Sequence, residues 1–545
     1  MAWVRRVRTT SGATAVQIAE SVDGVRRIVR HVGSAHDVTE LNLLIARAHE
    51  LLADDTQGSL DLGLYIGQPV QSLMESPPAQ GTLVPAKPRR VRKRLVAPPR
   101  VVRTASQLLY NVMAEVYDTL GFSVLGDEHF KELVIAKIVE PTSLVDVDRV
   151  LAGMGKVAAS LSTRNRTLKA AYNGKYRDLL AETCFRHASK HGDVSLCLYD
   201  VTSLRTHAEQ EDAAGLRKQG YSKDRSVDPQ VVIGLLVDRS GFPLEIGCFE
   251  GNTAETKTIL PVIRAFQTRH GIEEMVIVCD AGMLSGTNLR ELDDAGFNFI
   301  VGSKQTTAPL DLVSHYRWHG DYFTDGQTID TITPKHRGSK STNNPCEKAE
   351  PRWTDEDHPT SWRAVWAYSA KRFRRDNTTL NKQEERARAI AAGLAKAKNA
   401  RFVVTTGTKP KVNETSLARA RKVAGLKGYV TNIPATLMPA AEIINSYRDL
   451  WRVEQSFRIF KSDLAASPFF ARKRHSIEAH MTIAFTALAV ARTIQARSGK
   501  TIKKVLRELQ PLRTALIRIN GTIQTLEPEI PPAATALIEA ITSRH

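Results

Sequence analysis

The chain has 545 residues, with 76 Lys plus Arg against 58 Asp plus Glu, which gives a formal net charge of +18 and a pI of about 9.7. Its 42% hydrophobic and 25% charged residues exclude a disordered or fibrous chain, and its length predicts about three or four domains. Five cysteines without a Cys-x-x-Cys pair argue against a disulfide framework and a cysteine-rich zinc site, so we expect a cytoplasmic protein. The large positive charge predicts a polyanion as the partner, and the alternative is a basic protein without such a partner.

The first hundred residues predict a small domain followed by a linker. Residues 1–64 read as an α+β unit of short strands and one helix, Asp37 to Ala53, and no apolar stretch follows the basic N-terminus, so we expect no signal peptide. Residues 65–103 hold seven of the 24 prolines and form a linker. The linker's basic end is either a solvated tether or an arm that contacts phosphates, and its candidate DNA-binding residues are Arg89, Arg90, Arg92, Lys93 and Arg94.

The central region changes from a helical to an alternating pattern. In residues 104–190, apolar side chains recur every three or four positions, which predicts a helical domain. In residues 191–304 we expect strands at 194–204, 231–237, 244–249, 275–279 and 298–302, with helices at 256–270 and 288–295. A hairpin followed by alternating helices and strands predicts a mixed α/β sheet.

The C-terminal half divides into three segments. Residues 305–438 are polar and broken by turns, with one clear strand at 401–405. Residues 439–498 predict two helices, 439–464 and 477–495, and residues 499–545 predict a basic helical tail. The longest nearly apolar run, Met481 to Ala491, has 11 residues, whereas a bilayer requires about 20, so we expect no membrane-spanning helix.

Two aspartates and a glutamate form a candidate metal site. Asp200 and Asp280 each follow an apolar strand segment, and strand ends of α/β sheets are where ligands gather, although helix capping or a turn explains each aspartate alone. Carboxylates from separate elements bind Mg²⁺ through oxygen. On the helix at 439–464, Tyr447, Glu454 and Lys461 are seven residues apart and therefore share a face. Glu454 is either the third acid or an ordinary helix partner of a nearby cation.

These residues carry a resemblance to a known family. Tyr447-x2-Leu450-x3-Glu454-x6-Lys461 resembles the Y-x2-R-x3-E-x6-K signature of bacterial insertion-sequence DDE transposases, with Leu450 at the arginine position. Tyr-Asp-Val-Thr at 199–202 and Val-Cys-Asp-Ala-Gly-Met at 278–283 resemble the family's two aspartate strands. Segments 220–225 and 249–253 also resemble the family, and residues 305–438 fit its β-rich insertion. The resemblance covers roughly residues 190–500.

The resemblance implies a ribonuclease-H-like α/β core that cuts DNA with two divalent ions, Mg²⁺ or Mn²⁺ in its place, held by Asp200, Asp280 and Glu454. Tyr447 and Lys461 would hold DNA phosphates, the first by a hydrogen bond and the second as a charge. The helical domain 104–190 and the linker would bind the ends of the element. Because Arg448 and Arg452 flank Leu450 on other faces of a continuous helix, Arg458 is the better replacement for the family's arginine, and Arg452 is a further candidate DNA contact.

The predicted function is therefore that of a DDE transposase. It would bind the terminal inverted repeats of its mobile element as a homodimer in a synaptic complex, cleave them and join them to target DNA, with no role for a membrane. Two alternatives stay open at this point. One is a ribonuclease-H-like nuclease without strand transfer, and the other is a DNA-binding protein whose catalytic site is dead.

Overall fold

The computed structural model describes residues 2–8, 14–22, 25–35, 44, 45 and 48, and from residue 99 onward all residues except 193, 207–214, 221–227, 273, 282–285, 337, 340, 341, 397–399, 407, 408, 468, 544 and 545. The chain divides into two compact units, Met1–Lys93 and Arg94–His545. The first unit contains a three-stranded antiparallel sheet of β1 (Ala2–Arg8), β2 (Thr14–Val22) and β3 (Val25–Ala35). Three predictions lie wholly or largely outside the described residues: the helix at 37–53, the basic positions Arg89 to Arg94, and segment 221–225.

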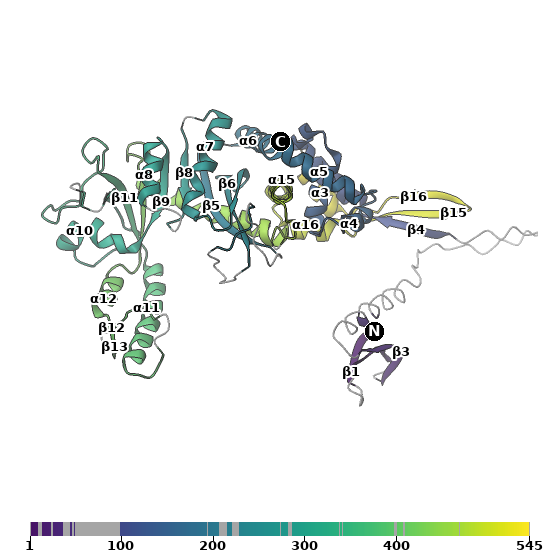
Figure 1. Cartoon of the computed structure of the whole chain (residues 1–545), viewed down its shortest axis with the longest axis horizontal. Coiled ribbons are helices and arrows are strands. Elements are labelled where there is room, and N and C mark those ends of the chain that lie inside the picture. Colours follow the sequence, from purple (N-terminus) through teal and green to yellow (C-terminus); the bar gives the residue numbers. More distant parts are fainter. Residues whose placement is uncertain are drawn as a thin grey trace, which may run out of the picture. The chain divides into compact units, whose positions relative to one another are not determined.

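Residues 107–191 form helices, as their apolar periodicity predicts, and pack around one central helix of the second unit. That central helix is α15 (Arg474–Ser498), which is seen end-on in Figure 1 among α3, α5 and α16. By length and composition α15 could cross a membrane, but 83% of its apolar window is buried inside the protein, which accounts for its composition. The surrounding helices are α2 (Gln107–Thr119), α3 (Glu128–Val139), α4 (Val147–Gly153), α5 (Leu161–Asn173) and α6 (Tyr176–His191), with the short η1 (Phe122–Leu125).

The catalytic-core prediction corresponds to five adjacent strands of one sheet in the order β7-β6-β5-β8-β9. β6 is antiparallel to both of its neighbours, β7 and β5, whereas β5, β8 and β9 are parallel to one another. Helices α7 and α8 return the chain before β8 and β9. This mixed sheet confirms the predicted ribonuclease-H-like α/β core. The elements are β5 (Leu196–Arg205), β6 (Gln230–Asp238), β7 (Pro243–Glu250), α7 (Ile259–His270), β8 (Val276–Cys279), α8 (Gly286–Asp294) and β9 (Asn298–Ser303).

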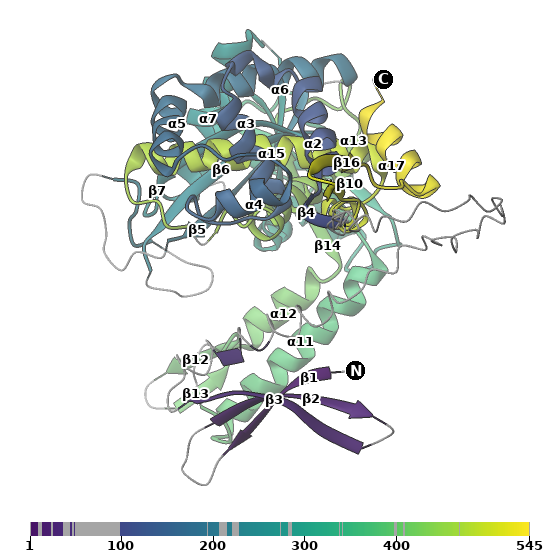
Figure 2. The same cartoon turned by 90° about the vertical axis from the view of Figure 1, so that its right-hand side faces the viewer.

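The polar segment after β9 extends the same sheet and adds a helical arm. Strands β14 (Leu426–Thr431), β11 (Ser361–Tyr368) and β10 (Thr328–Pro334) follow β9 in antiparallel order. The arm consists of α11 (Ala370–Ala391) and α12 (Glu414–Lys422), with the hairpin of β12 (Val403–Thr406) and β13 (Lys409–Val412) beside its far end (Figure 2). The arm has a small core of its own around Leu380, Phe402 and Leu417.

The single helix predicted at 439–464 is wrong, because the structure divides it. It consists of α13 (Ala440–Arg448), α14 (Trp451–Arg458) and a π-helical turn, η4 (Ile459–Asp463). Between α13 and α14 the backbone tightens into three-residue hydrogen bonds, from Leu450 N–H to Tyr447 O and from Arg452 N–H to Asp449 O. The π turn then changes the angular spacing again, so positions seven residues apart do not keep one face.

The C-terminal tail was predicted to be helical, and it also contains a hairpin. After α16 (Ile502–Leu509), strands β15 (Thr514–Ile519) and β16 (Thr522–Leu526) are joined by Asn520 and Gly521, both at positive φ. Asn-Gly is the favoured pair for such a two-residue turn. β15 also pairs with β4 (Arg100–Ala105), and α17 (Pro532–Thr542) packs on α15.

Candidate active site

Asp200 and Asp280 lie side by side in the sheet. The parallel register of β5 and β8 pairs Leu198 with Val278, and both aspartates follow two residues later. They are therefore neighbours across strands about 5 Å apart and point to the same face. Asp200 lies inside β5, which continues to Arg205, in agreement with the strand predicted at 194–204. Asp280 directly follows β8, as predicted.

Hydrogen bonds to Oδ1 help to orient each aspartate. Oδ1 of Asp200 accepts a bond from the Val201 N–H at 2.8 Å. Oδ1 of Asp280 accepts from the Ala281 N–H at 2.8 Å and from the hydroxyl of Tyr447 at 2.7 Å. These three hydrogen bonds hold the two carboxylates in defined orientations.

Tyr447 is a buried residue of the site, and its predicted contact with a DNA phosphate stays a prediction. Its side chain is only 6% exposed, and its hydroxyl is used by Asp280. Burial, followed by the bond to Asp280, raises the pKa of this phenol, so it acts as a hydrogen-bond donor. Gly302 makes room for it, because a Cβ at that position would lie 2.5 Å from the Tyr447 hydroxyl.

Lys427 is a candidate residue that sequence reasoning missed. It lies on β14 with its Nζ 4.3 Å from the centre of the Tyr447 ring. Burial lowers the pKa of Lys427, the charges of Arg372 and Arg448 lower it further, and the carboxylates of Asp280 and Glu454 raise it. The ammonium thus lies within the field of both acids. Lys427 and Tyr429 are two residues apart and therefore lie on one face of the strand. This spacing could have indicated the site, but the polar segment 305–438 was not predicted to contain this strand.

The other predicted contacts are distributed over different sides of the helix pair. Arg448 was expected to face away, but its charge acts on Lys427 and Tyr429, because β14 passes beside α13. Arg452 points instead toward a second cavity and Asp449. Glu454 and Arg458 are exposed on α14, Lys461 lies half-buried in the π turn, and Leu450 is buried in the core.

The donor chemistry fits a divalent metal ion, although the described part of the chain does not form a closed site. Two adjacent carboxylates match the preference of Mg²⁺ for oxygen ligands. Among the residues that the structure describes, no three His, Cys, Asp or Glu side chains gather closely enough to hold an ion.

Comparison with known proteins adds a family to this geometry. The family model described as "Transposase DDE domain" matches residues 192–490, more than half of the chain. A search of curated proteins gives no match. The chain is also similar to the chain in the "Cryo-EM structure of piggyBac transposase synaptic complex with hairpin DNA (SNHP)", with 9% identity, a TM-score of 0.35, and coverage of 73% of this chain and 70% of that chain. At that TM-score the similarity adds nothing to the fold assignment, which rests on the strand order.

Proposed function

The chain belongs to the transposase family defined by the DDE domain, and we propose that Asp200, Asp280 and Glu454 are its metal ligands. DDE transposases use divalent ions, and we propose two Mg²⁺ ions here. The observation that carries the assignment is the position of Asp200 and Asp280, each two residues beyond the paired Leu198 and Val278, with the Tyr447 hydroxyl bonded to Asp280 and the Lys427 ammonium near the Tyr447 ring.

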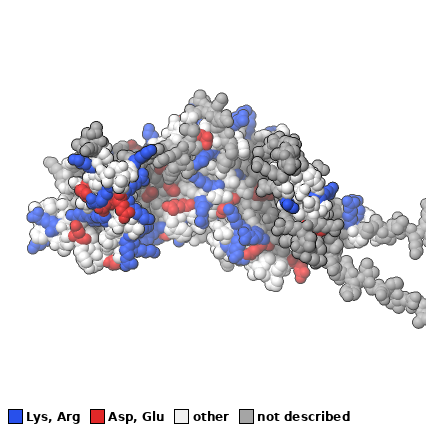
Figure 3. All heavy atoms as spheres, turned by 90° about the horizontal axis from the view of Figure 1, so that it is seen from below, with Lys and Arg blue, Asp and Glu red and all other residues white. Residues whose placement is uncertain are grey.

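We further propose that the protein acts on the terminal inverted repeats of its own element, as a homodimer on DNA. The Y-x2-x-x3-E-x6-K spacing supports placement in the bacterial insertion-sequence group, with Leu450 in place of the arginine. The net charge of +18 supports binding to DNA. Basic side chains form several clusters on the face shown in Figure 3, with acidic side chains between them.

The chain's own residues supply most of what phosphodiester chemistry requires. In the first step a bond forms between a water oxygen and phosphorus while the bond from phosphorus to the 3′-oxygen breaks, and the proton lost by the water is balanced by the one that the 3′-oxygen gains. In the second step the freed 3′-hydroxyl oxygen loses its proton and forms a bond to a phosphorus of the target DNA, while the bond from that phosphorus to a target 3′-oxygen breaks and this oxygen takes up a proton. Bound divalent ions would activate the nucleophile and stabilise the leaving oxygen. Lys427, Arg448 and Arg372 would stabilise the charge on the phosphate, and the Tyr447 hydroxyl would hold Asp280 in place.

The experiment measures cleavage and joining of a labelled DNA fragment that carries the sequences flanking the gene. Asp200→Ala, Asp280→Ala and Glu454→Ala should each abolish cleavage in Mg²⁺ while leaving DNA binding largely intact. Glu442→Ala is the matched control, since it removes an exposed acid from the adjacent helix α13. Near-normal cleavage by any of the three variants would exclude that residue as a ligand. Cleavage without joined products would instead indicate a nuclease.

A further inference from the structure

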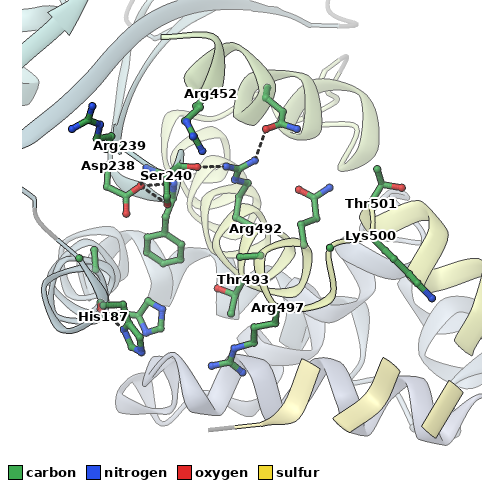
Figure 4. Close-up of a pocket in the computed structure, with 18 of the residues that line it drawn as sticks. His187, Asp238, Arg239, Ser240, Arg452, Arg492, Thr493, Arg497, Lys500 and Thr501 are labelled. Atoms are coloured by element: carbon green, nitrogen blue, oxygen red, sulfur yellow. Dashed lines mark hydrogen bonds between the residues drawn. The ribbon is translucent and has the colours of Figure 1, made fainter. Parts of the chain in front are cut away.

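A cavity of about 870 Å³ lies beside α14, with Arg452 on its wall (Figure 4). Its walls come from the turn between β6 and β7, from α6, α14 and α15, and from the start of α16. Arg452 lies two residues before Glu454, which is about 200° around the helix, so α14 separates the cavity from the proposed active site. We call it the basic cavity because of the cations that line it: Arg239, Arg452, Arg492, Arg497 and Lys500.

The positive charge of the basic cavity is only partly compensated. Asp238 is its one lining acid among the described residues, and its Oδ1 already accepts bonds from Ser240 N–H, Ser240 Oγ and Phe242 N–H. Arg239 and Arg452 share Asp449, and Lys500 binds Glu508 at 2.6 Å. The remaining two guanidiniums, Arg492 and Arg497, form no ion pair with a carboxylate in the part of the chain that the structure describes.

Arg492 is the cation that is held most firmly in the cavity wall. It donates to Gln455 Oε1 at 2.8 Å and to the carbonyl oxygen of Ser240, both of which are neutral acceptors. Gly241 permits this approach, since a Cβ there would lie 2.5 Å from Nη2 of Arg492. Burial lowers the pKa of Arg492 and of Arg497, and it outweighs the opposing charges of Asp238 on Arg492 and of Glu115 on Arg497. A buried charge in this situation is stabilised when an anion binds.

The distance to the active site suits a DNA strand. Asp238 on the cavity wall pairs with Cys197, and Asp200 lies three residues farther along β5, which is about 10 Å at about 3.3 Å per residue. A DNA strand advances about 3.4 Å per nucleotide along the helix axis. Cys197 and Asp200 are three residues apart and point to opposite faces of the sheet, so a DNA strand at Asp200 has to pass around α14 to reach the cavity and needs at least about three nucleotides to do so.

We propose that the basic cavity binds backbone phosphates of the DNA strand whose scissile phosphate lies at Asp200 and Asp280. This inference rests on the proposed function, because it takes the position of the cut from it. Arg492 and Arg497 contact phosphate oxygens, and Lys500 adds a charge at the rim. The shared chemistry is that of a phosphate group, so a free nucleotide is the competing source.

The test measures the salt dependence of binding between the full-length protein and a 20-base-pair duplex in EDTA, where no cleavage takes place. Each lost phosphate contact lowers the slope of log K against log salt by about 0.9, so the double variant Arg497→Gln/Lys500→Gln should lower it by up to about 1.8. The control is Arg149→Gln/Arg388→Gln, which removes the same charge from two exposed arginines that already pair with carboxylates. Its slope should exceed that of the cavity variant by at least about 0.9.

Three outcomes would overturn the proposal. The first is equal slopes for the cavity and control variants. The second is binding of ATP or inorganic phosphate that depends on Arg497 and Lys500 while duplex binding does not. A variant in the cavity wall can fail to fold, so wild-type protein is also treated with phenylglyoxal, which modifies arginine, with and without duplex. The duplex should reduce the modification of Arg492 and Arg497 at least fivefold. Absence of protection is the third. These readouts need no cleavage, so a failure here leaves the tests of Asp200, Asp280 and Glu454 unaffected.

Discussion

Removal of the Tyr447 hydroxyl tests whether the orientation of Asp280 controls catalysis. Tyr447→Phe keeps the ring, which packs edge-on against Tyr429 at 5.0 Å, and deletes only the 2.7 Å hydrogen bond to Oδ1 of Asp280. A hydrogen bond to a charged group contributes about 1.5–3 kcal/mol. At about 1.36 kcal/mol per tenfold change, cleavage should slow by roughly 10- to 150-fold if the bond is needed in the transition state.

The assay is single-turnover cleavage measured over a range of Mg²⁺ concentrations. A misoriented Asp280 should bind the ion more weakly, so we expect the half-saturating Mg²⁺ concentration to rise together with the loss in rate. Tyr429→Phe removes a hydroxyl from the neighbouring ring and is the matched control. Gly302→Ala provides a second approach, because its methyl group would lie 2.5 Å from the Tyr447 hydroxyl and would displace it. Cleavage by Tyr447→Phe within twofold of wild type at every Mg²⁺ concentration would refute the reasoning.

Two further predictions concern other charged groups. Lys427→Met keeps an aliphatic chain over Tyr447 but removes a preorganised cation, so the rate of cleavage should fall about 100-fold. The control is Lys422→Met, since the Nζ of Lys422 lies 4.0 Å from the Tyr316 ring, and this variant should change the rate less than threefold. Equal effects of the two variants in the cleavage assay would exclude Lys427 from the site. Burial raises the pKa of Asp311 to about 7, so the folded state binds a proton that the unfolded state has lost between about pH 4 and 7, and stability falls as the pH rises through that window. Asp311→Asn keeps an acceptor for the Trp366 Nε1–H but carries no charge at any pH. Its unfolding free energy should exceed that of the wild type by about 4 kcal/mol at pH 8 and equal it near pH 4. Denaturant titrations at both pH values measure this difference, and a pH-independent difference would contradict the prediction.

Local patterns predicted the strands of the core and two of its acids. The apolar runs at 231–237 and 275–279 have the composition of buried strands, and Asp280 follows the second run directly, so its position needed no tertiary information. The same kind of pattern could have found the C-terminal hairpin, because Asn520-Gly521 between two apolar stretches is a strong turn signal.

The remaining features depend on contacts between distant segments. Lys427 belongs to the site only because β14 pairs with β9, which places the strand beside α13. The role of Tyr447 follows from Gly302, which is 145 positions earlier in the chain (447 − 302). No proline or glycine near Leu450 marks the division of the helix in the sequence. The local geometry follows instead from the burial of Leu450 and from packing against the sheet. Reasoning from ideal helical spacing therefore misplaced Arg448.

The pairing of β4 with β15 bears on how the protein is made. Thr104 and Ala515 are partners, so 411 residues (515 − 104) must be synthesised before β4 finds its neighbour. At about 5–20 residues per second the wait is roughly 20–80 s. During that time the ribosome-bound chain presents an unpaired strand that carries Val101 and Val102, which stay about half exposed even in the finished fold. A copy of the gene that is interrupted before codon 514 leaves this strand permanently without its partner, and we expect its product to expose an edge that favours aggregation.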